Sequence, residues 1–355
     1  MSTSPNERLN VGLVGLGYWG PNLARNIARS ENANLAYLCD LSTDLHDQYR
    51  SSFPTSKFTT DFADLLNDDS LDAVVLASPV PTHHQLGRMS IDAGKHTFIE
   101  KPLALNAADA KDLVDAAEAK DVKLMVGHLL EYHPGVLKVK ELIDTGELGD
   151  VLYAYSHRLN LGQFRRDENA LWSLGVHDVA TLLFLLGDVA PTEVSARGES
   201  YLHDGVEDVV FGTMTFPSGV MAHIHLSWLD PHKIRKLTVV GSHQMVVFDD
   251  MEADRKVTVY DKGFSVHNGQ RPGSGSWGEY ISKREGDIHI PRLATAEPLR
   301  LEVEHFFECI REDRTPRSDA NAGLRVVQVL ESMQQSLENG GIPVKLAGTQ
   351  AAGAR

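Results

Sequence analysis

Apolar and polar positions alternate in a regular way along the first 128 residues. Short and nearly continuous apolar runs are typical of buried parallel strands. The predicted strands are Asn10–Gly15, Leu35–Asp40, Ala73–Ser78, His96–Glu100 and Lys123–Gly127. Helical spacing separates them, and the predicted helices are Pro21–Ser30, Asp61–Leu66, Thr82–Ala93 and Ala107–Lys120. Strand and helix in alternation predict a doubly wound α/β domain.

The pattern changes after about residue 130. One more helix is expected over residues 131–148, and short strands with turn signals between them follow. The predicted strands are Leu152–Leu159, Glu193–Tyr201, Val209–Phe216, Val220–Leu229, Lys236–Val240, Met245–Asp249 and Lys256–Tyr260. A helix at Val176–Leu186 interrupts them. Hairpin signals such as Phe216-Pro217-Ser218-Gly219 indicate an α+β domain with a large, mostly antiparallel sheet.

The last third is expected to contain a long loop and two helices. Residues 263–297 are rich in Gly, Ser, Arg and Pro and are predicted to be loop, followed by helices at Leu299–Arg311 and Ala320–Asn339. We therefore expect a cofactor-type domain over residues 1–130, a second domain over 131–318, a helix over 319–345 that returns to the first domain, and a tail over 346–355.

Composition narrows the class of protein. A chain of 355 residues with 42% hydrophobic and 23% charged residues suits about two globular domains. It has no apolar run long enough for a membrane span, a polar start and only two cysteines, Cys39 and Cys309, so a cytoplasmic location is expected. The net charge of −15 disfavours nucleic acid and anionic membranes as partners.

A glycine motif follows the first predicted strand. The spacing Gly15-x-Gly17-x-x-Gly20 suits a dinucleotide: the first glycine makes a tight turn, the second admits pyrophosphate, and the third allows close helix packing. Asp40 ends the second strand, where a carboxylate accepts hydrogen bonds from ribose hydroxyls and repels a 2′-phosphate. The motif therefore predicts a Rossmann domain that binds NAD. The alternatives are a turn without ligand, a capping role for Asp40, and FAD or S-adenosylmethionine binding.

Lys101 is the first candidate for chemistry. It follows the strand His96–Glu100, so it lies at the carboxyl end of a parallel strand, where ligands of such sheets bind. Partial desolvation there would favour the neutral amine and make Lys101 a usable acid or base. The alternative is a surface lysine that extends its ammonium group into water.

Three motifs resemble one family. The runs GLGYWG at 15–20, ASPVPTHH at 77–84 and EKPLA at 100–104 are similar to the Gfo/Idh/MocA oxidoreductases, and the similarity extends through HLSWLDPHKIRKLTVVGS at 225–242. The resemblance implies that Lys101 lies beside the nicotinamide and the substrate hydroxyl. It also implies an open second sheet that forms a homodimer or homotetramer interface. The cofactor contacts it implies beyond the motif above are Tyr18, Trp19, Ser78, Pro79, His83 and Glu100.

The same resemblance assigns a catalytic role to His177, at the start of a helix and opposite Lys101. Many polyol dehydrogenases of the family carry an aspartate four residues before this histidine, where this chain has Ser173. GHLLEYHP at 127–134 and RRDENALWSLGVHD at 165–178 resemble the subgroup that oxidises C3 of UDP-N-acetylhexosamines and their uronic acids. The substrate contacts expected are Lys101, His128, Arg165, Trp172, Ser173 and His177.

Each of these residues has a structural alternative. His177 would be an inert helix cap, Trp172 a core residue, and Asp178 a first-turn carboxylate instead of a partner of His177. His223 and His225 lack a Cys or carboxylate spaced to complete a ligand set, so no metal site is expected. The alternatives to a nucleotide-sugar dehydrogenase are a free-sugar or inositol dehydrogenase, a keto-sugar reductase, and a non-catalytic NAD-binding regulator.

Overall fold

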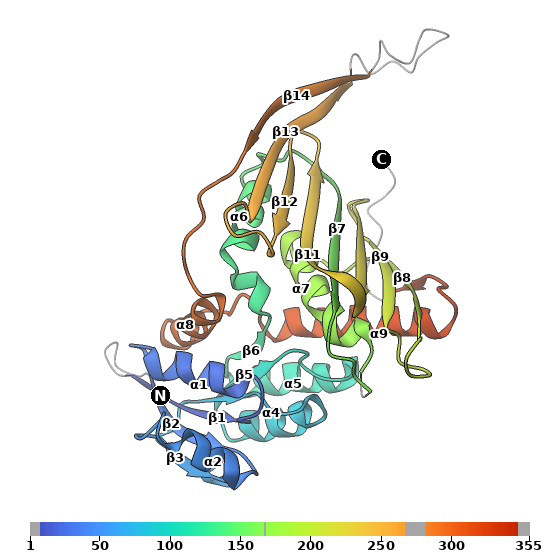
Figure 1. Ribbon diagram of the computed structural model, residues 1–355. Helices are drawn as coiled ribbons and strands as arrows, with labels where there is room; N and C mark the ends of the chain where they lie inside the picture. The colour runs from blue at the N-terminus through green and yellow to red at the C-terminus, as the bar shows by residue number, and fades with distance from the viewer. Residues whose placement is uncertain (1–7, 167, 267–280, 347–355) are drawn as a thin grey trace. The chain divides into compact units, whose positions relative to one another are not determined.

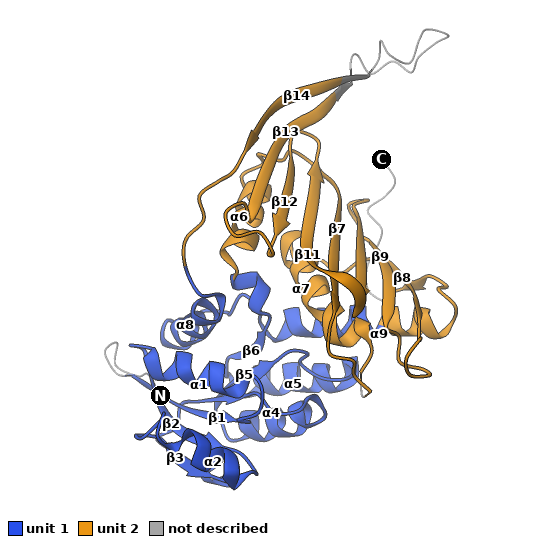
Figure 2. Cartoon of the chain, viewed as in Figure 1, with its two compact units in different colours: residues 1–132, 296–331 blue, residues 133–295, 332–355 orange. Residues whose placement is uncertain are grey.

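A computed structural model describes residues 8–166, 168–266 and 281–346. The chain forms two compact units (Figure 2). The first contains the residues up to Tyr132 together with Ala296–Glu331, and the second contains His133–Thr295 and the residues from Ser332 onwards.

The first unit is built on a six-stranded parallel sheet of order β3-β2-β1-β4-β5-β6 (Figure 1). Its strands are β1 (Leu9–Val14), β2 (Ala33–Cys39), β3 (Lys57–Thr59), β4 (Ala73–Leu76), β5 (His96–Glu100) and β6 (Leu124–Gly127). The strand order reverses between β1 and β4, which is where doubly wound sheets bind ligands outside the carboxyl ends of their strands. The predicted Rossmann fold is confirmed.

Helices cover both faces of this sheet. They are α1 (Gly20–Arg29), α2 (Thr43–Arg50), α3 (Ala63–Leu66), α4 (His83–Asp92), α5 (Ala107–Lys120) and α8 (Pro298–Arg311). The ring of Phe98 in β5 packs on Phe306 of α8, with the ring centroids 5.8 Å apart. The next residue, Ile99, lies against Gly87 of α4. Since successive strand residues point to opposite faces, α8 and α4 cover opposite sides of the sheet.

The assignment of α8 differs from the expected domain boundaries. Residues 296–318 were expected in the second domain, but α8 lies in the first unit. Helix α8 is held there by apolar packing. Its residues Leu299, Val303, Phe306 and Phe307 belong to the same buried core as Leu9 and its neighbours in β1. The last helix, α9 (Ala320–Glu338), begins in the first unit and ends in the second.

The second unit contains a nine-stranded sheet of order β14-β13-β12-β11-β7-β10-β9-β8-β15. Its strands are β7 (Val151–Leu161), β8 (Glu193–Glu199), β9 (Val209–Thr215), β10 (Met221–Ser227), β11 (Leu229–Gly241), β12 (Met245–Asp249), β13 (Val257–Val266), β14 (Ile281–His289) and β15 (Val344–Lys345). The β7–β10 pair is parallel and the other neighbours are antiparallel, so the predicted mostly antiparallel sheet is confirmed.

Helices α6 (Pro134–Asp144) and α7 (Val176–Leu185) pack on one face of this sheet. Ser156 of β7 donates a hydrogen bond to the Asp178 carboxylate of α7, so the even-numbered residues of β7 face the helix. Tyr153, Tyr155 and His157 therefore point to the other face, where they form a row of ring contacts.

Most differences from the predicted elements fall in polar segments. The prediction missed α2 and β3, and residues 131–148 form the shorter α6 after a 3₁₀ turn at Leu129–Tyr132. The expected loop over 263–297 was wrong at β14, which pairs with β13 along a charged segment. Residues 267–280 of that loop and 347–355 of the expected tail lie outside the described residues. Within the described part, no helix has both the length and the apolar character to cross a bilayer.

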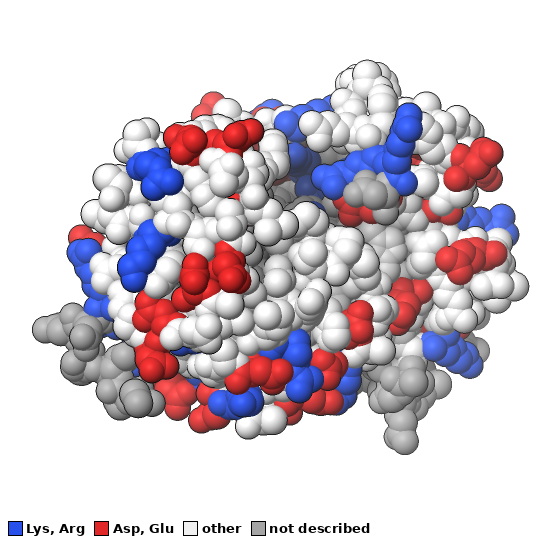
Figure 3. Space-filling model, turned by 90° about the horizontal axis from the view of Figure 1, so that it is seen from below, with Lys and Arg blue, Asp and Glu red and all other residues white. Residues whose placement is uncertain are grey.

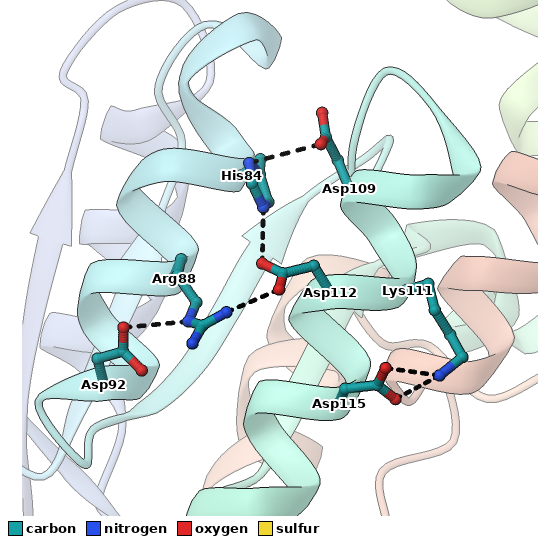
Figure 4. Close-up of polar contacts among 7 residues, drawn as sticks. All are labelled: His84, Arg88, Asp92, Asp109, Lys111, Asp112 and Asp115. Atoms are coloured by element: carbon teal, nitrogen blue, oxygen red, sulfur yellow. Dashed lines mark hydrogen bonds and ion pairs between the residues drawn. The ribbon is translucent and has the colours of Figure 1, made fainter.

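Acidic and basic side chains are interspersed over the face shown in Figure 3. One such network links α4 to α5 (Figure 4). The Asp112 carboxylate accepts hydrogen bonds from His84 Nε2 at 2.8 Å and from Arg88 Nη1 at 2.7 Å, and Arg88 also pairs with Asp92 at 3.0 Å. The hydrogen bond from His84, and then that from Arg88, lower the pKa of Asp112.

We predict that Asp112→Asn lowers the free energy of unfolding at pH 7, because it removes the carboxylate that pairs with both His84 and Arg88. The loss should be only about 1 kcal/mol, because solvent screens a half-exposed ion-pair network. Asp115→Asn, which removes a pair within α5 only, should cost about 0.5 kcal/mol or less. Since the folded pKa of Asp112 is lowered, its contribution is present above the unfolded value of about 3.9 and is lost as pH falls through the folded pKa. Urea denaturation of both variants checks this, and equal losses would contradict it.

Candidate active site

The candidate residues of the first unit lie at one edge of its sheet. Gly15 follows β1, Asp40 follows β2, Ser78 follows β4, Lys101 follows β5 and His128 follows β6. These strands are neighbours and all parallel, so their carboxyl ends lie side by side. The edge brings together most of the residues predicted to hold a dinucleotide.

The three glycines differ in what surrounds them. Gly15 has φ +96° and a Cβ there would lie 2.6 Å from the carbonyl oxygen of Ala77, so the turn and its approach to β4 require glycine. A Cβ on Gly20 would lie 1.9 Å from the Gly15 oxygen. A Cβ on Gly17 would meet nothing within 4 Å. The fold itself needs Gly15 and Gly20, whereas the space above Gly17 suits a phosphate group that approaches the backbone.

Asp40 is held by two backbone donors. Leu16 N–H donates to Asp40 Oδ2 at 2.7 Å, and Ser42 N–H donates to Oδ1 at 2.9 Å. The first bond ties the carboxylate to the glycine turn, and the second closes a two-residue turn that leads to Ser42, the N-cap of α2. Each oxygen retains acceptor capacity beyond these bonds, so this turn and ribose binding are compatible.

His83 supports this edge from below the surface. It is buried. Its Nε2 lies 2.9 Å from the carbonyl oxygen of Ser78, and its Nδ1 lies 2.8 Å from the carbonyl oxygen of Pro102. Burial lowers its pKa, against the effect of the two carbonyl hydrogen bonds. Ser78 Oγ also contacts Thr82 Oγ1 at 2.7 Å, and Pro79 is exposed at the start of the turn Val80–Thr82. His83 therefore links the β4 and β5 loops through their backbones.

The lysine is partly exposed and has a buried acid next to it. Lys101 N–H donates to Glu100 Oε2 at 3.3 Å, and a Cβ on Gly127 would lie 3.0 Å from the Glu100 carboxyl. The absence of a side chain at Gly127 thus makes room for Glu100 beside β6. Burial raises the pKa of Glu100 to about 7, while the charge of Lys101 opposes this rise.

Three further candidate residues of this unit differ in their exposure. His128 is buried, neither ring nitrogen has a hydrogen-bond partner among the described residues, and burial together with the Lys101 charge lowers its pKa to about 3. His128 is therefore a neutral imidazole at physiological pH. Trp19 packs partly against the core, while Tyr18 is 91% exposed next to Gly17.

The predicted residues of the second unit gather before and at the start of α7. A π-helical turn, Leu171–Gly175, leads directly into α7, and such turns are frequent at functional sites. It carries Trp172, which is half-buried, and Ser173, which is buried with no partner for Oγ among the described residues. His177 follows in the first turn of α7 and is partly exposed.

Asp178, the acidic residue after His177, has partners on β7. Its carboxylate receives hydrogen bonds from Ser156 and from Arg158 Nε, the latter at 2.6 Å, so it fastens α7 to β7. Arg165 lies on the exposed segment before the π-turn and pairs with Glu168. Lys101 and His128 belong to the first unit and His177 to the second, so their convergence on one substrate stays a prediction.

The residues that sequence reasoning missed are acidic and buried. Glu131 follows β6 in a 3₁₀ turn, and Glu302 lies on the inner face of α8 with no exposed surface. The signal for Glu302 was present, because it occupies a core position of a helix whose neighbouring core positions are Leu299, Val303 and Phe306.

Comparison with known proteins agrees with this geometry. Residues 9–128 match the family model described as oxidoreductase family, NAD-binding Rossmann fold, and residues 136–247 match the GFO/IDH/MocA C-terminal domain. The chain belongs to the Gfo/Idh/MocA oxidoreductase family. Among its relatives is the scyllo-inositol 2-dehydrogenase (NAD(+)) of Bacillus subtilis strain 168, 26% identical over 356 residues, which span 96% of this chain and 97% of that protein.

Solved structures share the fold over nearly the whole chain. UDP-N-acetylglucosamine 3-dehydrogenase GnnA from Acidithiobacillus ferrooxidans has a TM-score of 0.78 at 22% identity, covering 94% of this chain and 98% of that one. GenD2 from gentamicin A biosynthesis, solved in complex with NAD, has a TM-score of 0.80 at 23% identity, covering 98% and 99%. The protein is thus an NAD-binding oxidoreductase of a sugar and polyol dehydrogenase family.

We predict that Gly17→Ala weakens NAD binding at least about tenfold, or about 1.4 kcal/mol, because the added methyl group takes the space of a phosphate. The variant should melt like the wild type, since nothing surrounds that position. Gly20→Ala should instead lower the melting temperature, because its Cβ meets the Gly15 oxygen at 1.9 Å. Calorimetric titration and thermal melting check both, and undiminished NAD affinity in Gly17→Ala would refute the phosphate assignment.

Proposed function

We propose that this protein oxidises a secondary alcohol of a nucleotide sugar, at C3 of a UDP-N-acetylhexosamine or its uronic acid, with NAD. The observation that supports a hydride-transfer site is the position of Lys101 at the end of β5, on the same edge of the sheet as the glycine turn after β1 and Asp40 after β2. Asp40 favours NAD over NADP, because the 2′-phosphate of NADP would be repelled by the Asp40 carboxylate.

The sugar assignment is supported by two features. The motifs at 127–134 and 165–178 resemble the UDP-N-acetylhexosamine subgroup, and GnnA, a UDP-N-acetylglucosamine 3-dehydrogenase, shares the fold. Ser173 stands where many polyol dehydrogenases of the family have an aspartate, which weighs against a free-sugar or inositol substrate. A reductase of a keto sugar is the reverse reaction on the same site.

The proposed mechanism assigns a proton step to this chain's own residues. NAD, when bound, supplies the hydride acceptor. Lys101 and His177 lie on either side of the substrate hydroxyl, and one of them removes its proton as the carbon is oxidised. Lys101, when charged, also stabilises negative charge on the oxygen. Trp172, Ser173 and Arg165 contact the sugar and its phosphates, and His128 contacts the substrate as a neutral group.

We expect Lys101→Ala and His177→Ala each to lower kcat by a factor of about 10² to 10⁴, as is typical for loss of an acid–base group. NAD binding should persist, because the glycine turn and Asp40 are intact. Exposed residues of the same type provide matched controls, Lys111→Ala on α5 and His232→Ala on β11. Turnover close to wild type in both site variants would remove the catalytic assignment.

A panel of ligands separates the proposed substrate from its alternatives. With NAD present, UDP-N-acetylhexosamines and their uronic acids should raise the melting temperature, since a ligand that binds only the folded state stabilises it. The same compounds should produce absorbance at 340 nm. A response to inositol or free sugars alone would establish the polyol alternative, and tight NAD binding without turnover of any compound would indicate a regulator.

We also propose that the protein forms homodimers or homotetramers through the exposed face of the second sheet. Large side chains lie open there, including Tyr153, Phe211 and Met221, which are 43%, 46% and 52% exposed. The rings of Phe211 and His225 stack with centroids 4.3 Å apart, and His157 lies 5.7 Å from His225. Such an apolar, aromatic face is typical of an interface between subunits.

This interface should weaken in acid. Burial lowers the pKa of His157, His223 and His225. The Lys236 charge lowers that of His157 further, and repulsion from a protonated His157 lowers that of the other two. The three rings are therefore neutral at pH 7 and gain charge only below about 6.5. We predict dissociation between pH 7.5 and 5.5 in sedimentation velocity. His225→Gln should reduce this pH dependence and His232→Gln should not, and a pH-independent assembly would exclude a role for these histidines.

A further inference from the structure

Two acidic side chains project into the space between β5 and α8, because Phe98, two residues before Glu100 on β5, packs on Phe306, one helical turn after Glu302 on α8. Glu302 on α8 has no exposed surface, and neither of its carboxyl oxygens has a hydrogen-bond partner among the described residues. Glu100 Oε1 is likewise buried without a partner in that part of the chain. The neighbours of Glu302 on its helix, Leu299, Val303 and Phe306, belong to the apolar core. An ionised carboxylate in such surroundings is strongly disfavoured.

The charges that act on Glu302 are negative. They come from Glu100 at the end of β5 and from Glu131 in the turn after β6, while Tyr132 is the neutral titratable group of the same turn. Two ionised carboxylates at such a site repel each other, so a pair of this kind holds a proton.

Three cationic side chains on neighbouring elements interact with groups other than Glu302. Lys101 acts on Glu100, and Arg317 lies over the Tyr132 ring at 4.8 Å and donates to the Glu131 backbone oxygen. From α1, which packs on α8, Arg25 pairs with Glu297 at 2.5 Å.

We propose that Glu302 is a neutral carboxylic acid at physiological pH, that it shares one proton with Glu100, and that Glu100 is thereby the proton acceptor for Lys101. Glu302 acts through Glu100 and is a positioning residue. The relay rests on the proposed dehydrogenase function, whereas the shared proton is a property of the protein alone. Burial raises the pKa of Glu302 well above its usual range and that of Glu100 to about 7, which suits proton transfer near neutral pH.

The proton balance of the relay is simple. The Lys101 ammonium transfers one proton to the Glu100 carboxylate and becomes a neutral amine. The amine then takes the proton of the substrate hydroxyl, so that an O–H bond breaks and an N–H bond forms. NAD, if bound, would supply the acceptor for the hydride that leaves the carbon as its C–O bond becomes C=O. Two electrons leave with the hydride, and one proton remains on Glu100 until solvent removes it.

Infrared spectroscopy of the full-length protein without cofactor tests the shared proton. The wild type should show the C=O stretch of a protonated carboxylic acid at pH 7 to 8, and Glu302→Gln should lose it. Glu308→Gln, an exposed position on the same helix, provides the matched control and should retain the band. A band that survives in Glu302→Gln, or none in the wild type, would overturn the proposal.

Thermal melting provides a second measurement that does not need the band. Because the pKa of Glu302 is raised in the folded protein, this group ionises in the unfolded chain above about pH 4.5 while it stays neutral in the folded one. The free energy of unfolding of the wild type is therefore unaffected by Glu302 below that pH, and it falls as pH rises towards the folded pKa. The melting temperature of Glu302→Gln minus that of wild type should increase from pH 5 to pH 8. The same difference for Glu308→Gln should stay flat, and a flat result for both would contradict a neutral Glu302.

The pH dependence of kcat tests the relay. Glu302→Leu removes a hydrogen-bond donor to the Glu100 carboxylate, so the pKa of Glu100 should rise and the acidic limb of the kcat–pH profile should move to higher pH. In Glu302→Gln the limb should return to its wild-type position, because the amide is also a neutral donor. Glu100→Gln should lower kcat at least about tenfold. If no sugar is turned over while the infrared and melting results hold, the proposed function fails and the proton pair stands. Normal turnover with unshifted profiles in all three variants would overturn the relay.

Discussion

The structure of the first unit depends on parallel pairing between β1 and its two neighbours, β2 and β4. Parallel strands end on the same edge, so residues as distant in the chain as Gly15 and His128 are brought to it by the sheet. The glycine turn is where this pairing is tightest. A Cβ at Gly15 would enter the backbone of β4, and a Cβ at Gly20 would enter the turn itself. The phosphate cradle therefore exists because the sheet must close around the turn, and Gly17 alone is left open to a ligand.

The same sheet also explains why strongly perturbed acids lie close to the proposed chemistry. The three middle residues of β5 are buried, and Glu100, which ends the strand, has its Oε1 atom buried beside Gly127, while Lys101 is partly exposed at the edge. Helix α8 returns from a distant part of the sequence to cover this place and adds Glu302. Burial of polar groups costs stability, and active sites are where proteins retain such costs. A fold optimised only for stability would place leucine at position 302.

Sequence reasoning succeeded where local signals agree with the fold. The strand β5 and the helix α5 were predicted at their observed bounds, since Gly94 and Pro102 flank the strand and Asn106 caps the helix. It failed for α2 and β14, whose polar sequences show little periodicity and whose structure depends on neighbours. The edge residues could be predicted because strand order determines which loops meet. The partners of Asp178 and the place of α8 could not, because they follow from contacts between distant segments.

The two units contribute to the proposed reaction in different ways. As proposed NAD contacts, the glycine turn and Asp40 would recognise features that every NAD molecule has, so they would not distinguish one sugar from another. Relatives at 22–26% identity share this fold and carry different substrate names, an inositol in one and a UDP-sugar in another. Specificity must then arise from residues that vary on a constant scaffold. In this chain the π-turn Leu171–Gly175 is such a place, because its wider backbone spacing presents Trp172 and Ser173 just before His177, and Gly175 packs it against Leu226 of β10. Under the proposed mechanism, a change in this turn would alter which hydroxyl is oxidised and would leave the glycine turn and Asp40, which belong to the other unit, unchanged.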